Sequence, residues 1–534
     1  MNNFACFFQR LQNLSSLYLL KLAHLRKSIC YLVVCYYRCF RVRLNTFLVH
    51  LLYFLLLSSI GFLVLLVSKP RNESFKPRNL DLFFTSVSAA TVSSMSTVEM
   101  EVFTNSQLLI LTILMFVGGE IFTSMCELFI KQFMIKKTQN KVSSSSSDLS
   151  CSSPPTINTI EQVELGLAQN QNPIQIHSLD SGFLKYHARK YLGFVVLGYL
   201  LVVHVFGVAL VSLYLTLISS AKEVLQTKGL KMITFSVFTT VSTFASCGFI
   251  PTNENMMVFS KNSGLLLILI PQVLLGNTLF PSCLRFSIWF LGTVSKKEEW
   301  NFLLKRPKEI GYLHLLPRLH STLLVPTVLG FIFVQFVLFN SMEWSSEALG
   351  GLNSYEKIIG VLFQCVNARH TGETIVDIST ISSAILVLFL VTMYLPPYTS
   401  YLPVQDTEEE EYSESKIKRK GNRILENYIF SQLSYLVIFI ILVCITERQK
   451  IKDDPINFSV LNIAIEVISA YGNVGFTTGY SCKRQLNPSN GCQDKWYGFS
   501  GRWSDGGKII LIVVMFFGRL KKFNMNGGKA WKLL

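Results

Sequence analysis

Charged residues are scarce in this chain. Asp, Glu, Lys and Arg make up 15% of its 534 residues, whereas soluble proteins carry about 25%. Half of the residues are hydrophobic, and the mean hydropathy is +0.40. This composition excludes an ordinary soluble protein and indicates a chain that crosses a membrane several times. Acidic residues are fewer than basic ones, which gives a net charge of +16. The positive-inside rule explains that excess, and no soluble basic face is present for nucleic acid, so no such partner is expected.

Residues for catalysis or metal binding are few and unpaired. The 8 histidines include no HxxxH pair, and no two acids within a predicted membrane span are three or four residues apart, so neither an enzyme nor a cofactor is expected. Cys30, Cys35 and Cys39 lack CxxC spacing and nearby histidines, which argues against a zinc site. Cys482 and Cys492 both fall in the last predicted outside loop, where an oxidising compartment allows a disulfide between them.

Residues 1–44 mix apolar and basic side chains. The run Ile29–Tyr37 is too short to span a membrane, which needs about 20 residues. It has no small-residue cleavage site, so a signal peptide is not expected. We interpret residues 1–44 as a basic cytoplasmic region that holds an interfacial helix.

One pattern recurs four times: an apolar span, a half-length apolar segment, a polar turn and a second span. It predicts an all-α polytopic membrane protein with about eight transmembrane helices around one central pore. Both basic termini then lie in the cytoplasm. Asn72, in the triplet Asn72-Glu73-Ser74, is a candidate glycosylation acceptor in the first outside loop. The predicted divisions are repeat A (45–136), a cytoplasmic linker (137–187), repeat B (188–300), repeat C (301–403), a second cytoplasmic linker (404–425), and repeat D with a basic tail (426–534).

The four turns share one aligned column. It reads Ser94, Gly248, Gly372 and Gly475. Non-helical backbone at membrane depth has to line a cavity, and inward-facing carbonyls can replace the hydration shell of a cation. Glycine suits such a turn because it reaches positive φ at little steric cost. We therefore predict that these four residues face one another as the selectivity filter of a pore.

Ser94 breaks the glycine column. Its Cβ disfavours left-handed backbone, so we expect its carbonyl to point differently from those of the glycines. Its hydroxyl can also narrow the ring. Losing one wide carbonyl contact should cost potassium more than sodium, which makes selectivity for sodium the hypothesis. The alternative is that the Ser94 hydroxyl only bonds its own backbone in the turn.

Three charged residues accompany the second spans. Arg519 ends the last apolar run, where it is either a positive charge beneath the filter that limits cation dwell or a side chain that snorkels to the interface. Lys508 marks the outer edge of the same span. Glu120 lies deep in the second span of repeat A and could pair with such a cation.

Longer phrases around the turns resemble the HKT family of plant high-affinity potassium transporters, within the Trk/Ktr/HKT superfamily. The similarity runs from about residue 45 to the C-terminus. The phrases that carry it are Ser93-Ser94-Met95-Ser96-Thr97-Val98-Glu99-Met100, Pro251-Thr252-Asn253-Glu254-Asn255-Met256, Val366-Asn367-Ala368-Arg369-His370-Thr371-Gly372-Glu373 and Phe516-Phe517-Gly518-Arg519-Leu520-Lys521-Lys522-Phe523.

The resemblance implies a function. In that family, serine at the first filter position followed by three glycines marks subfamily 1, whose members are generally passive sodium uniporters of the plasma membrane. It implies withdrawal of Na+ from the xylem in salt tolerance, and a possible homodimer in the lipid bilayer. Some serine-type members also pass potassium, so a K+ or mixed Na+/K+ transporter, including a symporter, stays open as the alternative.

Overall fold

The computed structural model describes residues 46–71, 77–147, 173–400, 432–485 and 491–524. The interfacial helix and cysteines predicted within residues 1–44, the acceptor Asn72 and the linker 404–425 lie outside this part. The chain divides into two compact units, residues 1–53 and 54–534, with the boundary inside the first helix. Everything described below concerns the second unit, apart from the first turns of that helix.

The described residues form helices and no strand. The same order recurs four times: a long helix, a short helix, a loop, a 3-10 helix and a further helix or bent helix pair. The first two sets are α2 (Thr46–Val67), α3 (Asn79–Ala90), η1 (Met100–Val102), α4 (Asn105–Gly118) and α5 (Glu120–Ser147), then α6 (Pro173–Leu217), α8 (Met232–Phe244), η2 (Asn255–Phe259), α9 (Ser263–Gly276) and α10 (Phe280–Ser295). 

The last two sets lack the bent pair. They are α13 (Arg318–Glu343), α14 (Ser354–His370), η4 (Ile378–Thr380) and α15 (Ser383–Tyr394), then α17 (Gln432–Thr446), α19 (Val460–Gly472), η7 (Phe499–Arg502) and α20 (Asp505–Asn524). Connecting helices complete the description: α7 (Ser219–Thr227), α11 (Glu298–Lys305), α12 (Pro307–Ile310), η3 (Glu347–Leu349), α18 (Arg448–Asp453) and η6 (Cys482–Arg484).

Local chemistry sets where several helices begin. Thr104 and Gln107 form a capping box at the start of α4, in which the Gln107 amide N–H donates to Thr104 Oγ1 over 3.4 Å and the Thr104 N–H donates to Gln107 Oε1 over 3.0 Å. Asn353 and Glu356 form a second box at α14. Each box satisfies donors that a helix start leaves unpaired. 

Among the described residues, three helices are long and apolar enough to cross a membrane, namely the stretches Phe47–Val67, Leu184–Leu217 and Arg318–Glu343. Two bent pairs pass the same test together: α4 with α5, bent by 56°, and α9 with α10, bent by 81°. The second span of repeat B therefore breaks at Asn277, between α9 and α10. The predicted linker 137–187 is shorter in the structure, since α5 continues through Ser147 and α6 begins at Pro173.

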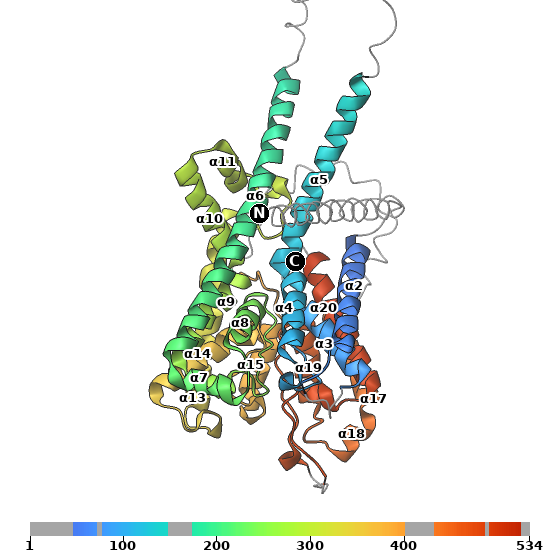
Figure 1. Ribbon diagram of the computed structural model, residues 1–534, viewed down its shortest axis with the longest axis vertical. Coiled ribbons are helices and arrows are strands. Elements are labelled where there is room, and N and C mark those ends of the chain that lie inside the picture. Colours follow the sequence, from blue (N-terminus) through green and yellow to red (C-terminus); the bar gives the residue numbers. More distant parts are fainter. Residues whose placement is uncertain (1–45, 72–76, 148–172, 401–431, 486–490, 525–534) are drawn as a thin grey trace, which may run out of the picture. The chain divides into compact units, whose positions relative to one another are not determined.

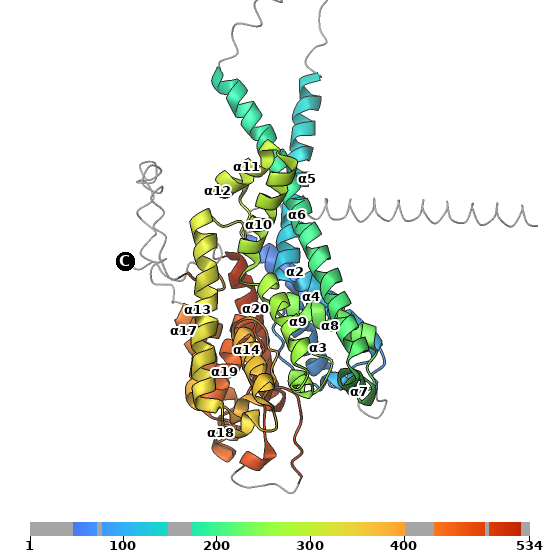
Figure 2. The same cartoon turned by 90° about the vertical axis from the view of Figure 1, so that its left-hand side faces the viewer.

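The short helices α3, α8, α14 and α19 lie at a similar height among the longer helices in both views (Figures 1 and 2). Helices α5 and α6 run side by side and pack with α10 and α11 around a shared apolar core. That core includes Ile121, Leu128, Leu192, Val196, Leu284 and Leu303.

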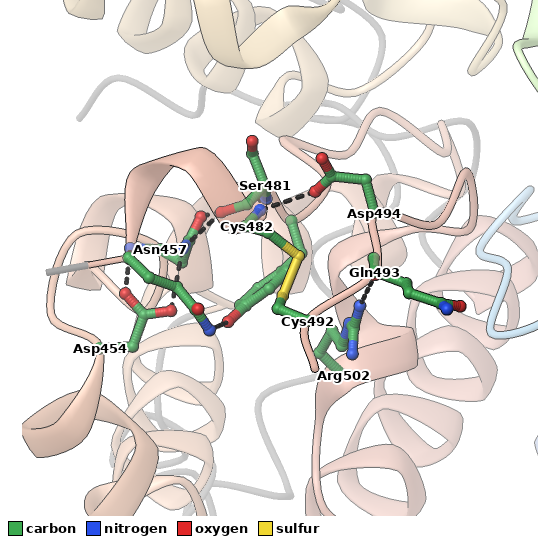
Figure 3. The surroundings of a disulfide bond; sticks show 10 residues. Asp454, Asn457, Ser481, Cys482, Cys492, Gln493, Asp494 and Arg502 are labelled. Atoms are coloured by element: carbon green, nitrogen blue, oxygen red, sulfur yellow. Dashed lines mark hydrogen bonds between the residues drawn. A yellow bond between two sulfur atoms is a disulfide. The ribbon is translucent and has the colours of Figure 1, made fainter. Parts of the chain in front are cut away.

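A hairpin closed by a disulfide separates the loop after α19 from η7. The disulfide joins Cys482 and Cys492, which are 10 residues apart in the chain (Figure 3). The Cys482 N–H donates to Asp494 Oδ1 over 2.6 Å, and Arg502 donates to the carbonyl of Gln493. These two hydrogen bonds thus hold the chain on both sides of the disulfide, at Cys482 and at Gln493.

Candidate functional site

The loops that follow the four short helices meet in one ring. A Cβ built on Gly248 would lie 2.2 Å from the Gly372 nitrogen, and one on Gly372 would lie 2.8 Å from the Cα of Gly475. A Cβ on Gly475 would lie 2.2 Å from the Cβ of Ser94. Contact between the Cys247 thiol and the backbone of Ser94 closes the circle. The structure therefore brings together the four residues aligned by the sequence, in the order Ser94, Gly248, Gly372, Gly475.

Ser94 adopts left-handed backbone, with φ of 53°. The expectation that its Cβ would prevent this conformation is wrong. The loop after α3 instead repeats the conformation of its counterparts, where Gly248 has φ of 91° and Gly475 has φ of 101°. What distinguishes Ser94 within the ring is thus its hydroxymethyl group, which fills space beside Gly475.

Gly372 differs from the other three ring residues. Its φ is not positive, so the expected conformational reason for glycine does not apply here. Helix α14 also runs on to His370, so it ends closer to its ring residue than the other short helices do. Glycine is required at this place for space, because a side chain would collide with the backbone of Val474 and Gly475.

Serines of the short helices hold the ring from behind, and the sequence interpretation missed them. The Gly248 N–H donates to Ser242 Oγ over 3.1 Å, and the Gly475 N–H donates to Ser469 Oγ over 3.0 Å. Ser88 has the same offset from Ser94. A recurring serine at this offset is the signal that would have identified them.

Asn255 joins the second loop to the third. Its Nδ2 donates to the carbonyl of Gly372 over 3.1 Å, and its Oδ1 accepts from the Thr374 N–H over 3.3 Å. Asn255 itself lies in the left-handed region, with φ of 56°. One side chain therefore fixes the backbone on both sides of Glu373. The sequence alone did not point to this residue.

The Glu373 carboxyl is fully buried beside the ring. Thr243 of α8 donates to its Oε1, and Oε2 has no hydrogen-bond partner among the described residues. Two other polar residues of this loop also lie behind the ring: Arg369 donates to the carbonyl of Pro396 over 2.7 Å, and His370 bonds the hydroxyl of Thr278.

The short helices α3, α8, α14 and α19 direct their C-terminal ends at the ring. A helix C-terminus carries a partial negative charge, which favours a cation. Glycines of the second helices allow these ends to approach closely. A Cβ on Gly118, Gly276 or Gly518 would lie 2.0 Å from the carbonyl of Ala90, Phe244 or Tyr471, respectively.

Arg519 is buried and lies against the bend between α4 and α5. Its guanidinium donates to the carbonyl of Gly118, lies 3.9 Å from Glu120 Oε2 and stacks 5.5 Å from the ring of Phe54. The snorkelling alternative therefore does not describe this side chain. Glu120 lies beside it and lines a cavity of about 60 Å³, together with Thr278, Pro396 and Gly518.

Lys508 lies in the first turn of α20, and its side chain is buried. Its Nζ lies 2.7 Å from Asp81 Oδ1, which links the start of α20 to the start of α3. Asp81 also accepts from Arg78 over 3.0 Å. Salt bridges therefore join repeats A and D. They lie on the side of the molecule that carries the 3-10 helices, which we call the outer side.

A second set of salt bridges joins repeats A and B on the outer side. Lys228 lies 2.8 Å from Glu101 and 2.6 Å from Glu254. Burial lowers the pKa of Lys228, but hydrogen bonds to both glutamates raise it, and the net direction is upward. Glu101 and Asn253 additionally exchange backbone-to-side-chain hydrogen bonds over 2.9 and 3.1 Å. 

The chain was compared with known proteins. The family described as TrkH, cation transport protein, matches residues 182–525. The chain is 50% identical to "Cation transporter HKT1;3" of Oryza sativa subsp. japonica, covering 92% of each chain. It is 51% identical to "Sodium transporter HKT1" of Arabidopsis thaliana, covering 88% of this chain and 91% of the relative.

A solved structure is similar as well. The crystal structure of the potassium transporter TrkH from Vibrio parahaemolyticus matches with a TM-score of 0.48 and 14% identity, covering 92% of this chain and 88% of that one. The family match and the identities over nearly the whole chain agree with the resemblance given by the four phrases quoted from the sequence. The chain belongs to the TrkH family of cation transport proteins and, within it, to the plant HKT transporters.

Proposed function

We propose that this protein is a passive, channel-like sodium uniporter, with Ser94, Gly248, Gly372 and Gly475 as its selectivity filter. The observation that carries the proposal is the close contact of these four residues, one from each repeat, in a single ring. A ring of backbone at the ends of four short helices can replace part of a cation's hydration shell. The name of the Arabidopsis relative, a sodium transporter, supports the choice of ion.

The hydroxymethyl group of Ser94 is the proposed source of sodium selectivity. It occupies space inside the ring that a glycine would leave open, and it lies against Gly475. A smaller ring excludes the larger potassium ion more than the sodium ion. Arg519 holds the bend beneath the ring, and its positive charge shortens the time for which a cation stays there.

The proposed setting is the plasma membrane of a plant cell, with both termini in the cytoplasm and Na+ withdrawn from the xylem. The basic residues at both ends of the chain favour this orientation. The four repeats, at residues 45–136, 188–300, 301–403 and 426–534, each supply one loop, so one chain makes one pore. Two such chains assemble as a homodimer in the lipid bilayer.

The second candidate is a transporter of K+ or of both ions. It is favoured by the name of a more distant relative, "Potassium transport protein 1" of Schizosaccharomyces pombe, which is 28% identical over 63% of this chain. It differs from the first proposal in one measurable property, the ion that sets the reversal potential.

Two-electrode voltage clamp on oocytes that express the full chain tests the proposal. For a sodium uniporter, the reversal potential should shift by about 59 mV for each tenfold change in external sodium. It should stay unchanged when external potassium is varied. Equal shifts with both ions would support the second candidate, and the absence of any cation current in chains present at the surface would contradict both.

A further inference from the structure

A short segment on the outer side binds two filter loops through consecutive backbone amides. We call residues 496–500 the return segment, because they follow the disulfide hairpin back to the filter. The Gly498 N–H donates to the carbonyl of Ser96 over 3.0 Å and to its hydroxyl over 3.1 Å. The Phe499 N–H donates to Thr477 Oγ1 over 2.8 Å, and the Ser500 N–H donates to Glu466 Oε1 over 2.9 Å. The return segment thus connects repeat A with repeat D.

Two of the residues that accept these hydrogen bonds lie close in the chain to members of the filter ring. Ser96 comes shortly after Ser94, and Thr477 comes shortly after Gly475. Ser94 and Gly475 are themselves in contact, with 2.2 Å between the Ser94 Cβ and a Cβ built on Gly475. The return segment therefore holds the one side of the ring at which a side chain, rather than a glycine, fills the space.

Gly498 fits tightly between these loops. A Cβ at this position would lie 3.0 Å from the Ser96 carbonyl oxygen, 3.4 Å from Thr477 Oγ1 and 3.5 Å from Glu466 Oε1. Its φ is −58°, which any residue can adopt. The absence of a side chain is thus needed for the close approach of the two loops and not for the backbone conformation.

The hairpin supports the return segment from outside. The Trp496 N–H donates to Glu99 Oε1 over 3.3 Å, which adds a contact to repeat A. The disulfide between Cys482 and Cys492 closes the hairpin just before the segment, and Arg502 just after it stacks 4.8 Å from the ring of Tyr480. In repeats A, B and C one 3-10 helix lies between the ring residue and the next helix, and it begins at Met100, Asn255 and Ile378, whereas repeat D has two, which begin at Cys482 and Phe499.

We propose that the return segment is a clamp that determines ion specificity by fixing the distance between Ser94 and Gly475. Gly498 and Thr477 are its positioning residues, because they act on the ring through Ser96 and through the loop of repeat D. This inference rests on the proposed sodium-selective filter. Loosening the clamp widens the ring on the side where Ser94 narrows it, so potassium gains more than sodium.

The substitution Gly498→Ala tests the clamp in oocytes. We expect the ratio of sodium to potassium permeability to fall by about fivefold, which corresponds to about 1 kcal/mol. The matched control is Gly491→Ala in the same hairpin, where a Cβ would meet nothing within 4 Å. This control should keep the permeability ratio of the unmodified chain. Surface biotinylation normalises each current to the amount of protein in the membrane.

A second pair of variants separates the clamp from a general loss of structure. Thr477→Val removes the oxygen that accepts from the Phe499 N–H, whereas Thr477→Ser keeps it. The valine variant should lower the permeability ratio as Gly498→Ala does, and the serine variant should not. If Gly498→Ala fails to reach the surface, the permeability ratios of the two Thr477 variants alone decide whether the clamp sets selectivity.

The outcomes distinguish the clamp from the function on which it rests. An unmodified chain without sodium-selective current contradicts the proposed function, and the clamp with it. A sodium-selective unmodified chain whose ratio is unchanged in Gly498→Ala and in Thr477→Val contradicts the clamp alone. An equal loss of selectivity in Gly491→Ala or Thr477→Ser also contradicts it, because neither control disturbs the contacts of the clamp.

Discussion

At the scale of single residues, the ring of Ser94, Gly248, Gly372 and Gly475, which we propose as the filter, depends on side chains that are small or absent. Gly248 and Gly475 satisfy two demands, a positive φ and a close neighbour, whereas Gly372 satisfies only the second. Ser94 accepts left-handed backbone, which costs a non-glycine residue about 1 kcal/mol or somewhat more. The surrounding loop imposes that conformation through bonds such as the one from the Ser93 N–H to the Ser88 carbonyl, over 2.8 Å.

Asn255 provides a prediction at this scale. The substitution Asn255→Ala removes the bonds to the carbonyl of Gly372 and the N–H of Thr374. A hydrogen bond of this kind contributes about 1 kcal/mol, so we expect the sodium current per surface protein to fall about fivefold. Voltage clamp with surface biotinylation measures this.

The control for that prediction is Asn262→Ala at the start of α9. The Asn262 amide is also buried, but it donates to Ser220 Oγ over 2.9 Å, away from the filter. It should leave the current close to that of the unmodified chain. Equal currents in both variants would show that Asn255 does not position the third loop.

The sequence predicts which residues form the ring, because four repeats align in one column. It does not predict their individual conformations. The φ of Ser94 follows from the hydrogen bonds of its loop, and Gly372, which lies just after the longer helix α14, does not have the positive φ of the other three. Supporting residues such as Asn255 escape notice because their partners lie in another repeat, far away in the chain.

At the scale of helices, the second helix packs closely against the short helix in repeats A, B and D, and in repeats A and B it also changes direction. The sequence predicts the positions of these helices well, since long apolar runs are unambiguous. It did not predict the 81° bend between α9 and α10. The bend lies just after Gly276, which packs against the carbonyl of Phe244, a contact that only the folded chain brings together.

The buried pair of Lys508 and Asp81 joins α20 to α3, and it makes a testable contribution to stability. The substitution Lys508→Met leaves the Asp81 carboxylate with the half-exposed Arg78 as its cation. Breaking a buried pair costs about 3 kcal/mol or more, so thermal unfolding of the detergent-solubilised chain should occur at a clearly lower temperature.

The double variant Asp81→Asn with Lys508→Met serves as the control. It removes the uncompensated charge, so it should unfold at a higher temperature than Lys508→Met alone. If the effects of the two substitutions simply add, the residues do not interact and the assignment of the pair is wrong.

The disulfide hairpin allows a second prediction at this scale. Replacing both Cys482 and Cys492 by serine removes a crosslink that spans 10 residues. Chain entropy predicts a loss of about 2 to 3 kcal/mol, seen as easier proteolysis of the outer loop. Replacing the unpaired Cys444 by serine is the matched control. Equal protease resistance of the double variant and the unmodified chain would contradict this contribution.

At the scale of the whole molecule, one chain brings four unlike copies of one unit around a common ring. Because the copies differ, the ring need not be symmetric: it carries one serine, two glycines with positive φ and one glycine, Gly372, whose φ is not positive. The repeats are joined in pairs by different contacts, such as Lys508 with Asp81 between D and A, and Asn255 with Gly372 between B and C. Selectivity can therefore be adjusted at one side of the ring without changing the others.

The central claim is that the side chain of Ser94 selects sodium, and the substitution Ser94→Gly tests it most directly. Since Ser94 already has φ of 53°, glycine fits the same backbone and removes only the hydroxymethyl group. The measurement is the reversal potential in voltage clamp while external sodium is exchanged for potassium. The account predicts a chain that follows sodium alone and a variant that gains sensitivity to potassium. A variant that still follows sodium alone, or an unmodified chain that already responds equally to potassium, would contradict it.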